Sequence, residues 1–151
     1  MIPNWTHIII HHSLTKDSLT VSWDEIKKFH MTDPKHMYKD IGYHFGVEQI
    51  ENDFQVLVGR PLTIVGAHTN QQNMNSRGIG IMFCGNFDLT IPSDLMLETA
   101  SRLIIAPLME IFKISPDHIH RHGDYANYKS CPGTKFPWVR FINILKGYLD
   151  A

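Results

Sequence analysis

Residues 5–12 read Trp-Thr-His-Ile-Ile-Ile-His-His, an apolar and largely β-branched run that ends in two histidines. A run of this kind is typical of a strand that is buried on both faces. Residues 78–84, Gly-Ile-Gly-Ile-Met-Phe-Cys, form a second run of the same type. The sequence therefore predicts a sheet that contains both segments, and Cys84 is expected to be a core residue within it.

A hairpin and the order of the elements complete the predicted architecture. Residues 42–50 and 54–58 read as two strands joined by a turn at 51–53. Strands come first and long helices last, which favours an α/β fold with a central mixed β-sheet flanked by helices. A length of 151 residues without a linker or repeat predicts a single domain over residues 1–151.

Three segments carry helical patterns. Ser22-Trp-Asp-Glu25 is a capping box that predicts a first helix. A long helix is predicted from near Pro92, and Pro107 within it should bend it or divide it in two. The last helix is predicted to begin near Pro137, a residue suited to a first turn. The apolar face of the long helix is expected to comprise Met96, Ala100, Leu103, Ile104, Leu108 and Ile111.

Charge and hydropathy exclude several classes of partner. The formal net charge is −1, with 14 basic and 15 acidic residues and no basic run, so we expect no nucleic-acid partner. No apolar stretch approaches the roughly 20 residues that span a bilayer, so we expect no membrane span. The N-terminus also lacks the features of a signal peptide, which predicts synthesis and folding in a cytoplasm. The two cysteines allow at most one disulfide and do not make a disulfide scaffold.

Histidine is the unusual residue of this chain, with 10 copies. Histidine and cysteine are residue types that bind zinc, and the eight residues between His122 and Cys131 form a loop that can bring both to one ion. A catalytic zinc site needs a third ligand and an open position. His11 or His12 can supply that ligand, but not both, because adjacent strand residues point to opposite faces.

The spacing alone does not choose a complete ligand set. A lone histidine is usually a hydrogen-bonded surface or core residue, and Cys131 by itself is equally consistent with an ordinary buried thiol. The remaining histidines without a local metal pattern are expected at the surface or in packing contacts: His7, His30, His36, His118 and His120.

Four motifs in order resemble the zinc amidases shared by amidase-type phage lysozymes and peptidoglycan recognition proteins. The first two are Ile8-Ile-Ile-His-His-Ser13 and Asp40-Ile-Gly-Tyr-His-Phe45. The third is Val65-Gly-Ala-His-Thr69, followed by Asn75-Ser76, Gly78-Ile-Gly-Ile and Gly85-Asn-Phe87. The fourth is His122-Gly-Asp124, followed by Lys129-Ser-Cys-Pro-Gly133. Each motif alone is weak, but four in this order over residues 6–147 are specific.

The resemblance implies a site and a reaction. His11, His122 and Cys131 are implied as the ligands of one Zn²⁺. Tyr43 is implied as the active-site tyrosine, and Lys129 stands where phage members carry a catalytic lysine. The implied reaction is hydrolysis of the amide between N-acetylmuramic acid and L-alanine in peptidoglycan, as in an endolysin. Lysine would donate to the oxyanion, and tyrosine would orient water or pass a proton.

The same resemblance makes His68, Thr69 and Asn75 candidates for substrate contacts. Asp124 is expected either to orient a ligand histidine or to be an ordinary loop residue. His44 is expected to make a structural hydrogen bond. The chain departs from the family pattern at Gly123, where relatives often carry a larger residue, and in a slightly longer loop before Cys131.

Peptidoglycan or a muropeptide is the expected partner, and the protein is expected to be a monomer that acts on the bacterial cell wall. If it is viral, its synthesis takes place in the host cytoplasm. The alternative function is a recognition module that binds peptidoglycan without cutting it. The presence of all three implied ligands favours the enzyme. A regulatory role toward another protein is a third interpretation, to which no residue can be matched.

Overall fold

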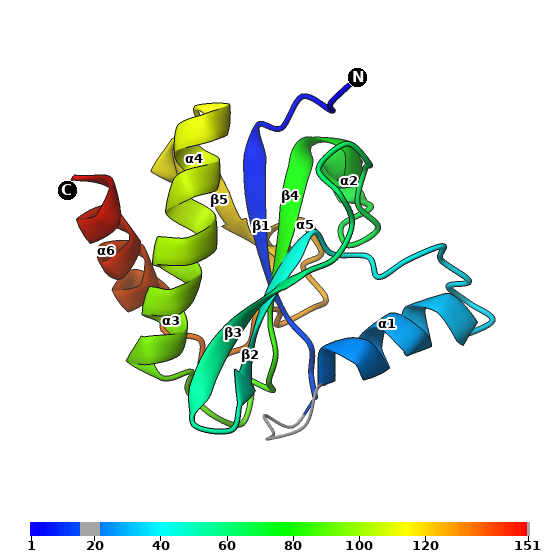
Figure 1. Cartoon of the computed structure of the whole chain (residues 1–151), viewed down its shortest axis with the longest axis horizontal. Helices are drawn as coiled ribbons and strands as arrows, with labels where there is room; N and C mark the ends of the chain where they lie inside the picture. Colours follow the sequence, from blue (N-terminus) through cyan, green and yellow to red (C-terminus); the bar gives the residue numbers. More distant parts are fainter. Residues whose placement is uncertain (16–21, 151) are drawn as a thin grey trace.

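The computed structural model describes residues 1–15 and 22–150, which form a five-stranded mixed sheet in the order β3-β2-β4-β1-β5 (Figure 1). Four strands run parallel, and β3 pairs with β2 in an antiparallel hairpin. The strands are β1 His7–His12, β2 Phe45–Ile50, β3 Asp53–Val58, β4 Gly78–Phe83 and β5 Ile119–Arg121. The predicted mixed sheet is confirmed.

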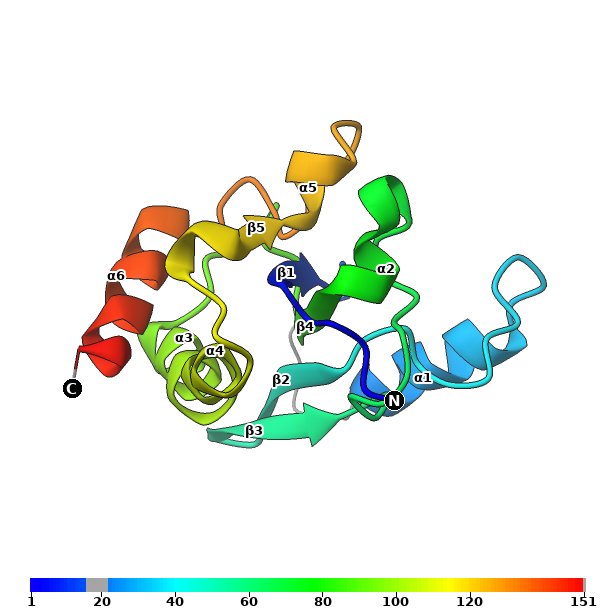
Figure 2. The same cartoon turned by 90° about the horizontal axis from the view of Figure 1, so that it is seen from above.

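Helices cover both faces of this sheet. Figures 1 and 2 show α3, α4 and α6 on one face and α1 on the other. The predicted α/β arrangement is therefore confirmed. The helices are α1 Ser22–Thr32, α2 Met74–Arg77, α3 Asp94–Ala100, α4 Ala106–Phe112, α5 His122–Tyr125 and α6 Trp138–Leu149, with 3₁₀ turns at Gln71–Asn73 and Pro116–His118. Within the described ranges, every helix is too short or too polar to cross a bilayer.

Strand β1, which lies between β4 and β5, has side chains on both faces of the sheet. Ile8 and Ile10 belong to the main core, which the α3–α4–α6 layer covers. Successive strand residues point to opposite faces, so His11 lies on the face that α1 covers. The ring of His12 turns the other way, where its Nδ1 accepts a hydrogen bond from the backbone N–H of Phe87 at 3.1 Å.

The hairpin begins later than predicted. Pairing in β2 starts at Phe45, so residues 42–44 precede the strand rather than belong to it. β5 was not predicted, because three residues are too few to show a strand period. It is nevertheless well defined, since Ile8, Ile9 and Ile10 of β1 pair with it in parallel register.

The long helix is divided, as predicted, by a π-helical turn at Ser101–Ile105 just before Pro107. Proline cannot donate to the carbonyl four residues earlier, and the wider turn accommodates that loss. The extra residue in the turn shifts the buried face, so the predicted positions of Leu103 and Ile111 are wrong. Leu103 is 50% exposed and Ile111 67% exposed. Ile105 and Met109 take their places in the core.

The helices α1 and α6 begin where the sequence predicted. The carboxylate of Glu48 on β2 accepts the first-turn backbone N–H groups of Ser22 and Trp23 in α1. This acceptor comes from a neighbouring strand, so the local capping pattern could not reveal it. Pro137 stands immediately before α6.

Candidate metal centre

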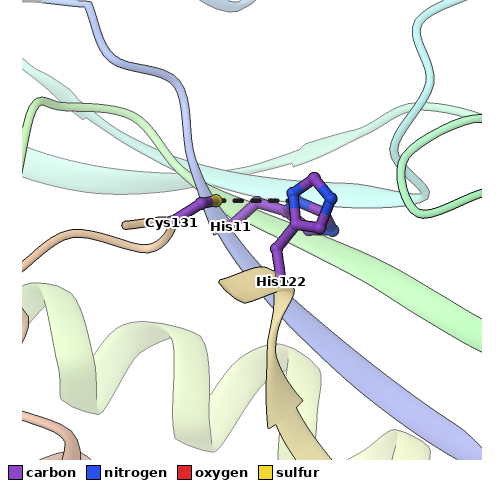
Figure 3. Close-up of side chains that lie close together, drawn as sticks. All are labelled: His11, His122 and Cys131. Atoms are coloured by element: carbon purple, nitrogen blue, oxygen red, sulfur yellow. Dashed lines mark hydrogen bonds between the residues drawn. The ribbon is translucent and has the colours of Figure 1, made fainter. Parts of the chain in front are cut away.

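Three side chains converge near the carboxyl ends of the neighbouring strands β1 and β5. The ligand atoms of His11, His122 and Cys131 all lie within 4.8 Å of one another, and all three residues are buried. Figure 3 shows the sulfur of Cys131 directed at the His11 ring, with His122 reaching the same place from the ribbon below. The Sγ atom of Cys131 lies 3.8 Å from Nδ1 of His11, and the two imidazole rings have centroids 4.6 Å apart.

Strand pairing brings these residues together. β1 places His11 at its carboxyl end, and β5, which pairs with β1, leads directly into α5 at His122. Cys131 lies on the following loop, which returns to α5 through a hydrogen bond from the Gly123 backbone N–H to the Cys131 carbonyl at 2.8 Å. A Cβ at position 123 would lie 2.8 Å from the Lys129 carbonyl oxygen. The absence of a side chain at Gly123 therefore lets this loop pack closely.

A second set of hydrogen bonds, accepted by Asp88, fixes the same loop. Asp88 accepts hydrogen bonds from Ser130 Oγ and from the Thr134 backbone N–H, each at 2.8 Å. These bonds flank Cys131 and hold the pKa of the Asp88 carboxyl below its usual range. Sequence reasoning did not single out Asp88, although it directly follows the Gly85-Asn-Phe87 motif.

The electrostatics of the three residues suit a metal ion. Burial lowers the pKa of His11 well below 6.5 and that of His122 to about 4, so both imidazoles are neutral at pH 7. Neutral imidazole is the form that binds metals. Burial raises the pKa of the Cys131 thiol to about 12, while the His12 backbone N–H, 3.4 Å from Sγ, opposes that rise. A divalent cation would supply the missing counter-charge for the thiolate.

The structure also distinguishes the two candidate histidines of β1. The ring of His11 faces His122 and Cys131, whereas the ring of His12 packs against Phe87 on the opposite face, with centroids 6.1 Å apart. His12 contributes only its backbone N–H to the thiol. Cys84 and Cys131 do not form a disulfide, and Cys84 is buried in the core as predicted.

The three predicted substrate contacts form one connected group behind His11. Nδ1 of His68 lies 3.0 Å from Nε2 of His11 and 3.1 Å from Oγ1 of Thr69. The side-chain oxygen of Asn75 accepts the backbone N–H groups of His68 and Thr69, both at 2.7 Å. Their contact with substrate stays a prediction, but the described hydrogen bonds give each of them a role within the protein.

The cluster of His11, His122 and Cys131 lies at a cavity of about 630 Å³. Tyr43 lines this cavity with its ring centroid 5.0 Å from that of His11, and enclosure of its hydroxyl raises the pKa. Lys129 lies on the opposite loop, exposed at the rim, and its charge contributes to lowering the pKa of His11 and His122. The two predicted catalytic residues therefore lie at the same cavity as the cluster.

An aromatic wall of this cavity was not anticipated. Phe29, His30, His36 and Tyr38 line one side, with the ring centroids of His36 and Tyr38 5.3 Å apart. The sequence predicts only surface or packing roles for His30 and His36. Their positions at the end of α1 and beyond it place them at the cavity only because α1 packs against the sheet beside β2.

The remaining polar residues have local roles. Asp124 accepts the Arg121 backbone N–H at 2.8 Å and thereby caps α5. This supports an ordinary local role for Asp124 rather than one in orienting a ligand histidine. His44 makes the predicted structural hydrogen bonds, from its Nε2 to the Ile64 carbonyl at 3.0 Å and from the Gly80 N–H to its Nδ1 at 3.1 Å.

The sequence matches the N-acetylmuramoyl-L-alanine amidase family over residues 3–134, and the chain belongs to this family. It is 35% identical over 129 residues to the endolysin of Escherichia phage T7, a match that covers 83% of this chain and 78% of the endolysin. The resemblance seen in the four motifs is therefore confirmed.

Solved structures agree with this assignment. The N-acetylmuramoyl-L-alanine amidase LysC from Clostridium intestinale URNW has a TM-score of 0.73 at 25% identity, covering 95% of this chain and 86% of LysC. Peptidoglycan recognition protein-LE, solved in complex with tracheal cytotoxin, a monomeric diaminopimelic acid-type peptidoglycan, has a TM-score of 0.72 at 26% identity, covering 91% of this chain and 79% of that protein. The family thus includes both amidases and recognition proteins.

Proposed function

We propose that this protein is a zinc-dependent N-acetylmuramoyl-L-alanine amidase that cleaves the bond between N-acetylmuramic acid and L-alanine in peptidoglycan. The observation that carries the proposal is the convergence of His11, His122 and Cys131 in one cavity with Tyr43 and Lys129. Residues 1–151 would form one amidase domain that works as a monomer on the bacterial cell wall.

The donor set fits zinc. Two neutral imidazoles and one thiolate are ligands that Zn²⁺ prefers, and three protein ligands leave a position free in tetrahedral geometry. His11, His122 and Cys131 would hold the ion, and the chemistry it would supply there is a lowered pKa of a water and polarisation of the scissile carbonyl. The cavity that adjoins the cluster provides room for the substrate amide.

Lys129 is proposed to donate to the oxygen of the scissile carbonyl as negative charge develops on it. Its ammonium group is a cation on the loop that carries Cys131, so the same backbone positions both side chains. A donor aimed at developing charge contributes about 10²–10³ in kcat. Lys129→Ala should therefore lower kcat by about this factor while zinc remains bound.

Tyr43 is proposed to orient the attacking water. Enclosure raises the pKa of its hydroxyl, so the group stays protonated at neutral pH and can both donate and accept a hydrogen bond. Tyr43→Phe should lower kcat by about 10²-fold or more without loss of zinc. A substitution that changes neither kcat nor KM would contradict this role.

The test is digestion of defined muropeptides by the zinc-loaded protein, followed by mass spectrometry. Zinc-dependent release of a free L-alanine N-terminus is the expected result. Lys146→Ala and Tyr148→Phe on α6, away from the cavity, are matched controls and should keep full activity. One bound zinc with muropeptide binding but without cleavage would instead support a recognition module, a class that the relatives also include.

A further inference from the structure

The ring of His68 occupies a slot that two glycines leave open. A Cβ added to Gly80 on β4 would lie 2.5 Å from this ring, and one added to Gly66 would lie 2.4 Å from it. The imidazole therefore lies flat against β4, next to β1 and the ring of His11. Its side chain is enclosed, so its position is set by the backbone around it.

Hydrogen bonding assigns the proton of His68 to Nε2. This nitrogen lies 3.0 Å from the Gly78 carbonyl oxygen, which can only accept, so Nε2 must carry the hydrogen. A neutral imidazole has one N–H, and a charged ring is disfavoured in so enclosed a site. Nδ1 of His68 is therefore an acceptor.

The same logic extends to His11. Its Nε2 lies 3.0 Å from Nδ1 of His68, and because that atom accepts, Nε2 of His11 must donate. The lone pair of His11 is then on Nδ1, the nitrogen that faces Sγ of Cys131 at 3.8 Å. A route through Thr69 gives the same result. Its hydroxyl, 3.4 Å from Nε2 of His11, can accept from His11 and donate to His68.

We propose that His68 is a positioning residue that selects the His11 tautomer with its lone pair directed at the metal site. The Gly78 carbonyl, His68 and His11 form a hydrogen-bonded relay from the backbone of β4 to the cluster. In this arrangement His68 acts through His11 and does not need to touch the substrate. The inference rests on the proposed metal site for its consequence, but the tautomer itself is a property of the metal-free chain.

Loss of this relay should weaken metal binding. Without Nδ1 of His68, only the more distant Thr69 hydroxyl, 3.4 Å away, can accept from Nε2 of His11. His11 can then place its hydrogen on Nδ1, which leaves no lone pair there for the ion. Partners that hydrogen-bond to a metal-binding histidine typically contribute 10–100-fold to metal affinity. His68→Leu removes both nitrogens and should weaken zinc binding by about this factor.

His68→Asn separates the relay from simple packing. The asparagine side-chain oxygen can take the place of Nδ1 as acceptor for His11, although the bond to Gly78 is lost. It should therefore retain the His11 tautomer and recover most of the zinc affinity. His118→Asn, at an exposed residue outside the cavity lining, is the matched control and should bind zinc like the wild type.

The direct measurement is the ring ¹⁵N spectrum of the metal-free full-length chain at neutral pH. The expected result is an Nε2–H tautomer at both His11 and His68, retained at His11 in His68→Asn and lost in His68→Leu. Zinc affinity is measured in parallel by competition with a chromophoric chelator. Thermal melts verify that each variant is folded.

Two results would overturn the inference: His11 carrying its hydrogen on Nδ1 in the wild type, or a folded His68→Leu that binds zinc as tightly as the wild type. Failure of the wild type to bind zinc would instead refute the proposed function. The spectrum would still report the tautomer of His11 in that case.

Discussion

The close contact at Gly123 gives a sharp test of how the cavity is held together. In Gly123→Ala the new Cβ would lie 2.8 Å from the Lys129 carbonyl oxygen and 3.2 Å from that of Cys131. The first distance is about 0.6 Å short of an ordinary contact of 3.4 Å. Both neighbours are backbone atoms, so the loop must move as a whole.

The expected cost follows from that displacement. Overpacking of this kind destabilises proteins by about 1–3 kcal/mol, which for a chain of this size lowers the Tm by about 2–12 °C. The moving loop carries Cys131 away from His122 and stretches the 2.8 Å hydrogen bond from Gly123 to the Cys131 carbonyl. We expect zinc affinity to fall by about tenfold or more, equivalent to about 1.4 kcal/mol.

Gly147→Ala is the matched control. Gly147 lies in α6, and apart from its chain neighbours and the backbone of its own helix, no atom lies within 4 Å of the position that a methyl group would take there. Alanine at this position should therefore be neutral or stabilise the helix by about 0.5–1 kcal/mol. Thermal melts with and without zinc, together with chelator competition, measure both effects. A Gly123→Ala protein with wild-type Tm and wild-type zinc affinity would refute the reasoning.

Four further results are expected. Phe141→Ala, at a fully buried core position, should destabilise the protein by about 3–5 kcal/mol in chemical denaturation, and a loss below about 1 kcal/mol would contradict this assignment. Glu48→Ala should lower stability by about 1–3 kcal/mol by leaving two α1 backbone N–H groups without their carboxylate, with Glu110→Ala as an exposed control. Burial lowers the pKa of His44 from 6.5 to about 4, so between these pH values the unfolded chain binds a proton that the folded chain does not. Stability of the metal-free protein should therefore fall as pH drops from about 6.5 to 4. His44→Gln should flatten that slope in pH-dependent melts. Burial raises the pKa of the Cys131 thiol to about 12, and both imidazoles of the cluster are neutral, so only the thiol has a proton to lose when zinc binds. Zinc binding at pH 7.5 should therefore release about one proton per ion. Calorimetry in buffers of different ionisation enthalpy measures this number, and a value other than one would contradict the prediction.

The sequence by itself determined the elements whose signal is local. The apolar runs at 5–12 and 78–84 predicted β1 and β4, and the turn at 51–53 predicted the hairpin. Hydrophobic periodicity and capping predicted α1, the divided long helix and α6, because side-chain direction repeats with a fixed period along each element. The four-residue helices α2 and α5 are too short to show such a period and were not predicted. Motif order was enough to indicate the family and to select the residues that converge on the cavity.

Spacing left His11 and His12 open, and the family resemblance pointed to His11. The tertiary structure supplies the physical reason, since the choice depends on which face of β1 turns toward β5 and its loop. It also revealed β5, whose three residues are defined by pairing with β1 rather than by their own pattern. The partners of the cluster, Asp88 and the backbone N–H of His12, lie 43 and 119 residues from Cys131 in the chain. Hydrogen bonds over such separations depend on how strands and loops meet in space, and no local pattern in the sequence records them.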